Sequence, residues 1–182
     1  MKNLTIIVLA AGKGTRMNSS VPKVFQPLGG MPLIEHVLDS AKKLNPKEIF
    51  LILNKDISKK HFKNEKLVHC FYQKKQLGTA DAVKACLSGL KKSKNKVLVM
   101  YADVPFIESR TLRNVINLKS PKEIKLLAFK KEENNSYGKI ILGTDGFVNE
   151  IIEQRELSSK DRYILCNSGV FCGSAKVFSQ LL

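Results

Sequence analysis

Continuous apolar runs alternate along this chain with segments in which apolar residues recur at every third or fourth position. Residues 4–10 form a nearly unbroken apolar run, which is typical of a strand buried on both faces of a sheet. Shorter runs at 49–53, 67–72, 97–101 and 124–129 also predict strands. Apolar positions within 33–44 and 82–90 follow helical spacing, and Ser109 or Thr111 is expected to cap a helix that reaches Leu118.

This β-α-β-α order predicts an α/β fold with a mostly parallel, mixed sheet and helices on both of its faces. The final third differs, because residues 139–142 and 147–152 flank Thr144-Asp145-Gly146, a pattern that favours a β-hairpin. We expect this hairpin to form a flap over the sheet edge, and residues 170–172 to add a last short strand. Since no repeat or low-complexity linker interrupts the chain, we expect a single domain over residues 1–182.

Composition narrows the class of protein. The chain has 182 residues, of which 43% are hydrophobic, as in ordinary globular proteins. Its apolar runs are shorter than the roughly 20 residues that a membrane span needs, so we expect a cytoplasmic protein without a membrane partner. The net charge of +15 comes from scattered lysines, which we interpret as a solvated surface rather than a nucleic-acid site. Cysteine and histidine spacings do not fit a zinc site, and buried, reduced thiols are expected.

A glycine-broken turn follows the first apolar run. The segment at 9–17 reads LAAGKGTRM and brings Lys13 and Arg16 close to Lys23, which follows Pro22. Small residues let backbone amides approach a ligand, and amides together with three cations are suited to a polyphosphate. The turn lacks the third glycine of a dinucleotide fingerprint and the spacing of a P-loop, so it predicts a different kind of nucleotide site.

A second loop with candidate chemistry follows the strand at 97–101. Asp103 stands there in the sequence YADVP, where its carboxylate could hold Mg²⁺ or, more simply, form a turn or a cap. Ligands of open parallel sheets bind beyond the carboxyl ends of the strands, so we expect Asp103 and the glycine loop to share one crevice. Gln73 follows a third strand, and its amide can donate and accept at once, which suits the O4 and N3–H edge of uracil.

These segments occur together in a known order. LAAGKGTRM, Pro22-Lys23, QLGTADAV, YADVP, YGKI and NSGVF follow one another as they do in sugar-nucleotide pyrophosphorylases. From residue 4 to 173 the chain most resembles the uridylyltransferase domain of bacterial bifunctional N-acetylglucosamine-1-phosphate uridylyltransferase/glucosamine-1-phosphate acetyltransferases. The resemblance implies the Rossmann-like nucleotide-diphospho-sugar transferase fold. It also implies synthesis of UDP-N-acetylglucosamine and pyrophosphate from UTP and N-acetylglucosamine 1-phosphate, with Mg²⁺ as cofactor, for peptidoglycan and lipopolysaccharide biosynthesis.

The resemblance also implies roles by position. Arg16 and Lys23 would stabilise charge on the reacting phosphates, and Asp103 would bind Mg²⁺; these three are the expected catalytic residues. The nucleotide would be bound by Leu9, Ala10, Ala11, Gly12, Lys23, Gln73, Gly78, Thr79, Tyr101, Ala102 and Asp103. The N-acetylglucosamine moiety would be held by Gly138, Glu153 and Asn167.

The chain also departs from the family pattern. Ala102 replaces the usual glycine before the metal aspartate, and Ala80-Asp81 replaces the usual Gly-His. No counterpart is found of the family's second Mg²⁺ ligand or of its left-handed β-helix, so we expect a truncated domain that is monomeric and impaired in activity. Three alternatives stay open. They are a methylerythritol phosphate cytidylyltransferase, whose opening loop is similar, a non-catalytic nucleotide-binding remnant, and a basic nucleic-acid binder.

Overall fold

The structure, a computed structural model, describes residues 3–12, 14, 19–90, 93–131, 135–153 and 165–182. Contacts between residues divide the chain into two compact units. The first contains Met1–Lys125 and Phe171–Leu182, and the second contains Leu126–Val170. Each unit is described by itself below. The expectation of a single domain stays a prediction.

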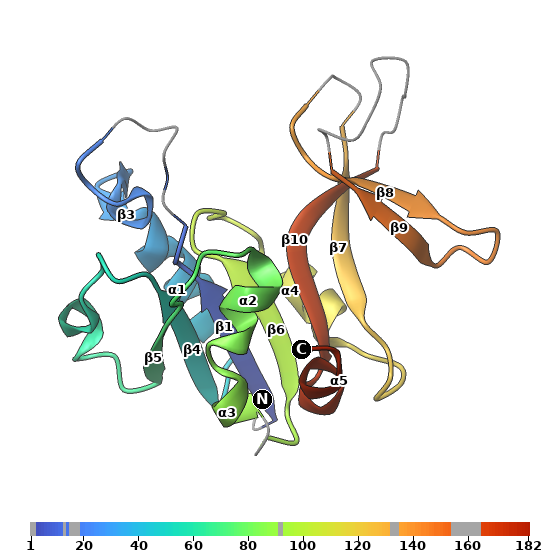
Figure 1. Cartoon of the computed structure of the whole chain (residues 1–182), viewed down its shortest axis with the longest axis horizontal. Helices are drawn as coiled ribbons and strands as arrows, with labels where there is room; N and C mark the ends of the chain where they lie inside the picture. Colours follow the sequence, from blue (N-terminus) through green and yellow to red (C-terminus); the bar gives the residue numbers. More distant parts are fainter. Residues whose placement is uncertain (1–2, 13, 15–18, 91–92, 132–134, 154–164) are drawn as a thin grey trace. The chain divides into compact units, whose positions relative to one another are not determined.

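The centre of the first unit is a parallel sheet with the strand order β5-β4-β1-β6 (Figure 1). Every residue of β1 is buried, as its unbroken apolar run predicts. Ile7 pairs with Phe50 on one side and with Val99 on the other, so β1 is a central strand. The far side of β6 pairs with the end of β10, which runs antiparallel. The strands are β1 (Leu4–Leu9), β4 (Glu48–Leu53), β5 (Val68–Tyr72), β6 (Lys96–Tyr101) and β10 (Leu165–Ser174).

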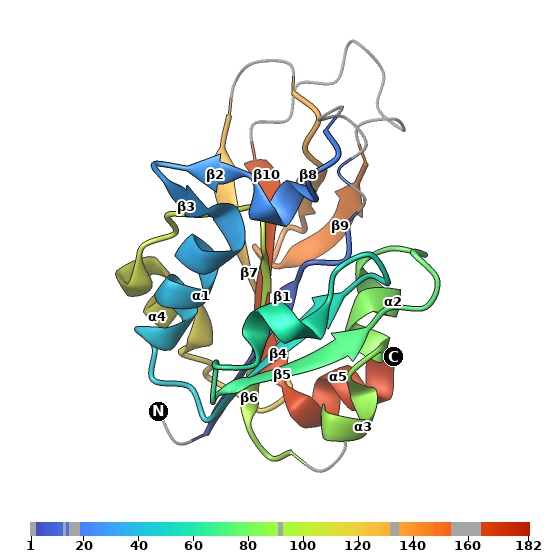
Figure 2. The same ribbon diagram turned by 90° about the vertical axis from the view of Figure 1, so that its left-hand side faces the viewer.

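Helices cover both faces of this sheet, as predicted, with α1 and α4 on one face and α2, α3 and α5 on the other (Figure 2). Ile7, Leu9, Phe50 and Ile52 point toward the second group of helices and form a buried core with their apolar side chains. The alternate strand residues face α1 and α4, because successive side chains point to opposite faces. The helices are α1 (Leu33–Lys42), α2 (Thr79–Lys84), α3 (Leu87–Leu90), α4 (Ser109–Ile116) and α5 (Ala175–Leu181).

Two predicted helices differ in detail. The prediction that Ser109 or Thr111 caps α4 was wrong. The capping residue is Glu108, so both predicted residues lie within the first turn of the helix. The helix ends at Ile116 rather than at Leu118. The helical stripe at 82–90 is divided between α2 and α3. There, the N–H groups of Ala85 and Cys86 bond to carbonyls three residues back rather than four.

Some short elements had no counterpart in the sequence prediction. Pro27–Leu28 (β2) and Met31–Pro32 (β3) form a small antiparallel hairpin, and residues Lys23–Phe25 and Lys59–Phe62 form single 3-10 turns. Gly29 and Gly30 both have positive φ at the hairpin turn, a geometry that glycine adopts without steric cost. These elements are too short to produce a hydrophobic period.

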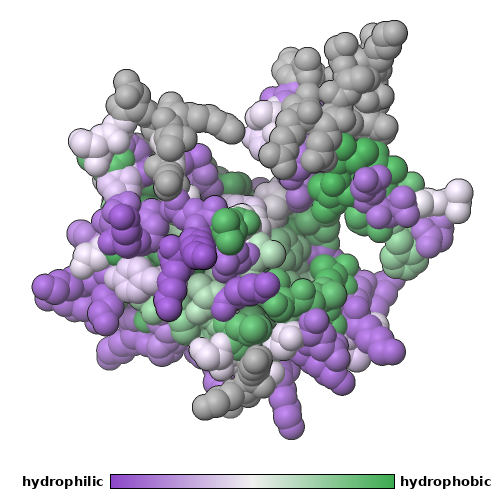
Figure 3. Space-filling view, in the orientation of Figure 1, coloured by the Kyte–Doolittle hydropathy of each residue, from purple (hydrophilic) through white to green (hydrophobic). Residues whose placement is uncertain are grey.

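The second unit contains the predicted hairpin, formed by β8 (Lys139–Leu142) and β9 (Val148–Ile152). Gly143 and Gly146 bond to each other across its turn, where Gly146 has a φ of 78°. The first half of β10 and β7 (Lys125–Lys130) complete this unit. Apolar side chains are exposed on the hairpin, and they produce the green area over it in Figure 3; they include Leu142, Phe147, Val148 and Ile151.

The four cysteines are free thiols, and Cys86, Cys166 and Cys172 are buried. Burial raises the pKa of the Cys86 and Cys172 thiols to about 12, since a thiolate would lose its hydration in the core. The expectation of buried, reduced thiols is therefore confirmed for these residues. In the part of the chain that the structure describes, no helix has the length and apolarity to cross a membrane.

Gly89 provides a test of the packing between α3 and the sheet. A Cβ atom at Gly89 would lie 2.8 Å from the buried ring of Phe50, which the core prevents from moving aside. We expect Gly89→Val to lower the free energy of unfolding by about 1–3 kcal/mol, the usual range for overpacking. The measurement is urea denaturation. The matched control is Ser88→Val on the exposed side of the same turn, and an equal loss in both variants would contradict the close packing of Gly89.

Candidate functional site

A cavity of about 430 Å³ lies in the first unit, at the carboxyl ends of its parallel strands. Leu9 ends β1 and residues 10–12 follow it, Gln73 follows β5, and Tyr101 and Asp103 stand at the end of β6. Open parallel sheets bind their ligands at this edge. The expectation that the glycine loop and Asp103 share one crevice is therefore confirmed.

Gly14 of the glycine loop lies directly beside Lys23, and both line the cavity. Gly14 has a φ of 62°, and a Cβ atom there would lie only 2.7 Å from Cβ of Lys23. A side chain at position 14 would therefore be strained by its own backbone and would also displace Lys23. The absence of a side chain on the second glycine of the G-K-G turn thus allows it to lie directly against the backbone and Cβ of Lys23.

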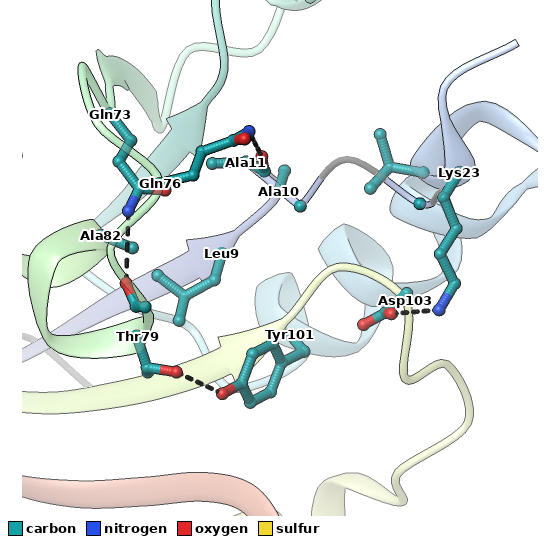
Figure 4. A pocket seen from close by; sticks show the side chains of 14 residues that line it. Leu9, Ala10, Ala11, Lys23, Gln73, Gln76, Thr79, Ala82, Tyr101 and Asp103 are labelled. Atoms are coloured by element: carbon teal, nitrogen blue, oxygen red, sulfur yellow. Dashed lines mark hydrogen bonds and ion pairs between the residues drawn. The ribbon is translucent and has the colours of Figure 1, made fainter. Parts of the chain in front are cut away.

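Lys23 and Asp103 form an ion pair at one end of the cavity, with 2.6 Å between Nζ and Oδ2 (Figure 4). Their side chains are 37% and 30% exposed, so a ligand that enters from solvent can reach both charges. A polyphosphate offers oxygens to the ammonium group, and a divalent cation can bridge a carboxylate and phosphate oxygens. The two charges are thus complementary to the two parts of a metal-bound triphosphate.

The other end of the cavity is lined by neutral polar groups (Figure 4). Gln73 is only 8% exposed, and its Nε2 donates to the carbonyl oxygen of Gly78 at 3.2 Å and to Oδ2 of Asp81 at 2.8 Å. Gln76 Nε2 donates to the carbonyl oxygen of Ala11 at 2.6 Å. A hydrogen bond of 2.7 Å joins the hydroxyls of Thr79 and Tyr101. These bonds hold the side chains in place around a space without a formal charge.

The geometry corrects the expected role of the Gln73 amide. The sequence suggested that it donates to one atom of uracil and accepts from another. Both hydrogens of its NH₂ group are instead directed to Gly78 and Asp81. Within this arrangement, the carbonyl oxygen is the polar atom of the amide that remains for a ligand.

The structure brings most of the predicted nucleotide residues together. The cavity is lined by Leu9, Ala10, Ala11, Gly12, Lys23, Gln73, Gly78, Thr79, Tyr101 and Asp103. Ala102 does not line it, because its side chain is fully buried; its backbone N–H donates to the carbonyl oxygen of Leu9. Arg16 lies outside the described residues. Four further lining residues were not among the expected site residues, namely Gly14, Val24, Gln76 and Ala82, although Gly14 belongs to the predicted glycine turn.

The three residues expected to hold the sugar lie together in the second unit. The backbone N–H of Asn167 donates to the carbonyl oxygen of Gly138 at 2.9 Å. A Cβ atom on Gly138 would lie 3.5 Å from Oε1 of Glu153. The side chain of Asn167 accepts from the N–H of Gly169 at 2.7 Å, which fixes its orientation. Glu153 and Asn167 thus both adjoin Gly138, and their binding of a sugar stays a prediction.

The expected Mg²⁺ fits this site in one specific way. No three His, Cys, Asp or Glu side chains among the described residues gather in an arrangement that could hold a metal ion. Mg²⁺ does not require such a cage, since it commonly takes one or two carboxylates and completes its shell with waters and substrate phosphates. Asp103, which lines the cavity beside Lys23, is suited to that mode.

Comparison with known proteins agrees with this reading of the cavity. Residues 6–158 match the model of the MobA-like NTP transferase domain. The bifunctional protein GlmU of Cereibacter sphaeroides is 33% identical over 98% of this chain, which spans 40% of that relative's length.

Solved structures show the same fold. A candidate glucose-1-phosphate thymidylyltransferase from Bacillus anthracis superposes with a TM-score of 0.80 at 20% identity, over 98% of this chain and 74% of that one. The inositol-1-phosphate CTP transferase from T. maritima gives a TM-score of 0.75 at 24% identity, over 96% of this chain and 72% of that one. The α/β nucleotide-diphospho-sugar transferase fold is thereby confirmed.

The fold and the cavity define a nucleotide-binding protein of the transferase class. The chain belongs to the family of MobA-like NTP transferase domains. The resemblance to the amino-terminal region of the bifunctional uridylyltransferases, which rested on the motifs, is also confirmed.

The ion pair between Lys23 and Asp103 predicts opposite effects of two substitutions on anion binding without a metal. Asp103 repels a bound anion and competes for the ammonium group. We therefore expect Asp103→Asn to tighten binding of inorganic triphosphate in EDTA by about two- to fivefold, the range typical of exposed ion pairs. Lys23→Met should weaken binding. Titration calorimetry measures both.

Lys42→Met is the matched control, because Lys42 forms an ion pair of 2.9 Å with Glu65 and does not line the cavity. We expect this variant to bind triphosphate as the unmodified chain does. Weaker binding by Asp103→Asn, or equal losses in Lys23→Met and Lys42→Met, would contradict the assignment of the anion to the Lys23 end of the cavity.

Proposed function

We propose that this chain transfers a uridylyl group from UTP to N-acetylglucosamine 1-phosphate, which releases pyrophosphate. The observation that carries the proposal is the cavity itself, which has a cation and a carboxylate at one end and neutral amides at the other. Such a division of charge suits a nucleoside triphosphate. The identity of 33% with GlmU, whose motifs this chain carries in order, supports the choice of nucleotide and sugar.

The proposed reaction needs no nucleophile from the protein. A phosphate oxygen of the sugar phosphate attacks the α-phosphorus of UTP, the bond from that phosphorus to the bridging oxygen of the β-phosphate breaks, and pyrophosphate leaves. Catalysis of this kind rests on alignment and on stabilisation of charge. We propose that Lys23 binds the phosphates and that Arg16 stabilises charge at the reacting centre.

Asp103 is the proposed ligand of Mg²⁺, which would neutralise phosphate charge when bound. Binding of the metal and the nucleotide would replace the ion pair between Asp103 and Lys23 with a contact of each side chain to the incoming ligand. Glu153, Asn167 and the backbone of Gly138 are the proposed partners of the sugar. Their clustering in the second unit supports a common role.

A pyrophosphate-release assay tests the proposed function. It would contain UTP, Mg²⁺ and either N-acetylglucosamine 1-phosphate or glucose 1-phosphate. We expect release that requires both the sugar phosphate and the metal, with N-acetylglucosamine 1-phosphate as the better acceptor. Binding of UTP without any release would contradict catalysis and favour a nucleotide-binding remnant, whereas release with CTP in place of UTP would favour a cytidylyltransferase.

Substitution of Arg16 is a separate prediction in the same assay. Removal of one group that stabilises charge in a transition state commonly costs about 10²- to 10³-fold in rate. We expect a loss of that size in kcat for Arg16→Ala, and a smaller loss for Arg16→Lys, which keeps the positive charge. Unchanged turnover of Arg16→Ala would show that Arg16 does not act at the reacting centre.

A further inference from the structure

We infer that Asp81 sets the base preference of this site by fixing the amide of Gln73, so that its oxygen rather than its NH₂ group meets the base. The inference rests on the proposed function, because it requires a nucleotide in the cavity. It concerns a position at which this chain departs from the family pattern, where Ala80-Asp81 replaces the usual Gly-His.

The orientation of the Gln73 amide follows from the chemistry of its two neighbours. One is the carbonyl oxygen of Gly78 at 3.2 Å, and the other is the Oδ2 atom of Asp81 at 2.8 Å. A carbonyl and an ionised carboxylate only accept hydrogen bonds, so the group between them must be the NH₂. A flipped amide would place its oxygen against two other oxygens. The structure therefore leaves this side chain a single favourable orientation.

Asp81 acts on a ligand only through Gln73. Gln73 lines the cavity, whereas Asp81 lies on the first turn of α2 and does not line it. The bond to Asp81 is charge-assisted and the bond to Gly78 is longer, so the carboxylate is the stronger of the two anchors. Asp81 is thus a positioning residue for the side chain that faces the ligand.

The base of a bound nucleotide lies at the Gln73 end of the cavity on electrostatic grounds. The ion pair of Lys23 and Asp103 attracts the phosphates and the metal to the opposite end (Figure 4). The Gln73 end carries amides and hydroxyls, which are suited to an uncharged ring; among them are Gln76 and Thr79. A nucleotide that places its triphosphate beside Lys23 therefore directs its base toward Gln73.

The fixed orientation selects among bases by their hydrogen-bond pattern. With both hydrogens of the NH₂ group engaged, the carbonyl oxygen of Gln73 is a pure acceptor. It pairs favourably with the N3–H of uracil or thymine. Cytosine in the same position presents a lone pair at N3, so the same oxygen would repel it and leave both acceptors unpaired, a costly arrangement in a buried site. The N4 amino group of cytosine could reach this oxygen only if the ring shifted from the position that uracil takes. The arrangement thus favours UTP or dTTP over CTP.

The test compares UTP with CTP in the pyrophosphate-release assay, with N-acetylglucosamine 1-phosphate and Mg²⁺, for the full chain and three variants. Asp81→Leu removes the acceptor while it keeps a similar shape. Asp81→Asn keeps an acceptor oxygen, and the carbonyl of Gly78 still opposes a flip of Gln73. Asp39→Leu makes the same change on the exposed side of α1 and serves as the control.

We expect the unmodified chain to have a kcat/KM at least roughly tenfold higher for UTP than for CTP, as one mismatched buried hydrogen bond can produce. Asp81→Leu should reduce this ratio about tenfold, while Asp81→Asn and Asp39→Leu should largely keep it. An equal loss for both nucleotides in Asp81→Leu, with an unchanged ratio, would show a merely structural role and overturn the inference. So would a preference of the unmodified chain for CTP.

Calorimetric dissociation constants for UTP and CTP separate this inference from the proposed function. If neither the unmodified chain nor any variant releases pyrophosphate, the proposed function fails. The ratio of the dissociation constants for UTP and CTP still decides the role of Asp81. A ratio that favours UTP in the unmodified chain and falls in Asp81→Leu supports the inference. Equal affinities for UTP and CTP in the unmodified chain overturn it. This comparison within the unmodified chain does not depend on whether a variant folds.

Discussion

The register between β1 and β6 is the constraint on which the site depends. Leu9 pairs with Tyr101 in neighbouring parallel strands, so the glycine loop and the Asp103 loop leave the sheet side by side. A further backbone bond joins the N–H of Ala102 to the carbonyl oxygen of Leu9, just where the two loops begin. Asp103 follows directly after this bond, and its carboxylate meets the ammonium group of Lys23 at 2.6 Å.

This arrangement divides the cavity into two chemically different ends. Lys23 and Asp103 make one end polar and charged, while the side chains held by hydrogen bonds at the other end make it neutral. A nucleoside triphosphate has the same division, with its charge in the phosphates and its directional hydrogen bonds in the base. The direction in which a nucleotide would bind thus follows from charge, and discrimination among bases follows from the donors and acceptors that remain at the neutral end.

The sequence predicted the central sheet because most of its strands are nearly unbroken apolar runs, and it predicted the shared crevice because parallel strands end at one edge. Contacts between side chains could not be predicted from the sequence. Asp81 lies within the QLGTADAV segment, but that segment does not connect its side chain with Gln73, whereas their bond of 2.8 Å in the structure does. Gln76 begins the same segment, and its place in the cavity was missed because its bond to the carbonyl oxygen of Ala11 joins residues far apart in the sequence. The sequence predicted only residues 170–172 of β10, because Asn167, Ser168 and Gly169 interrupt its apolar pattern.

The division of the cavity can be observed directly in a crystal structure of this chain with Mg²⁺ and a non-hydrolysable analogue of UTP. The predicted result is a triphosphate within hydrogen-bond distance of Lys23 Nζ, a metal on the Asp103 carboxylate, and a uracil N3–H on the Gln73 oxygen. A nucleotide bound outside the cavity, or one that places its base beside Lys23 and its phosphates beside Gln73, would contradict the assignment of the two ends.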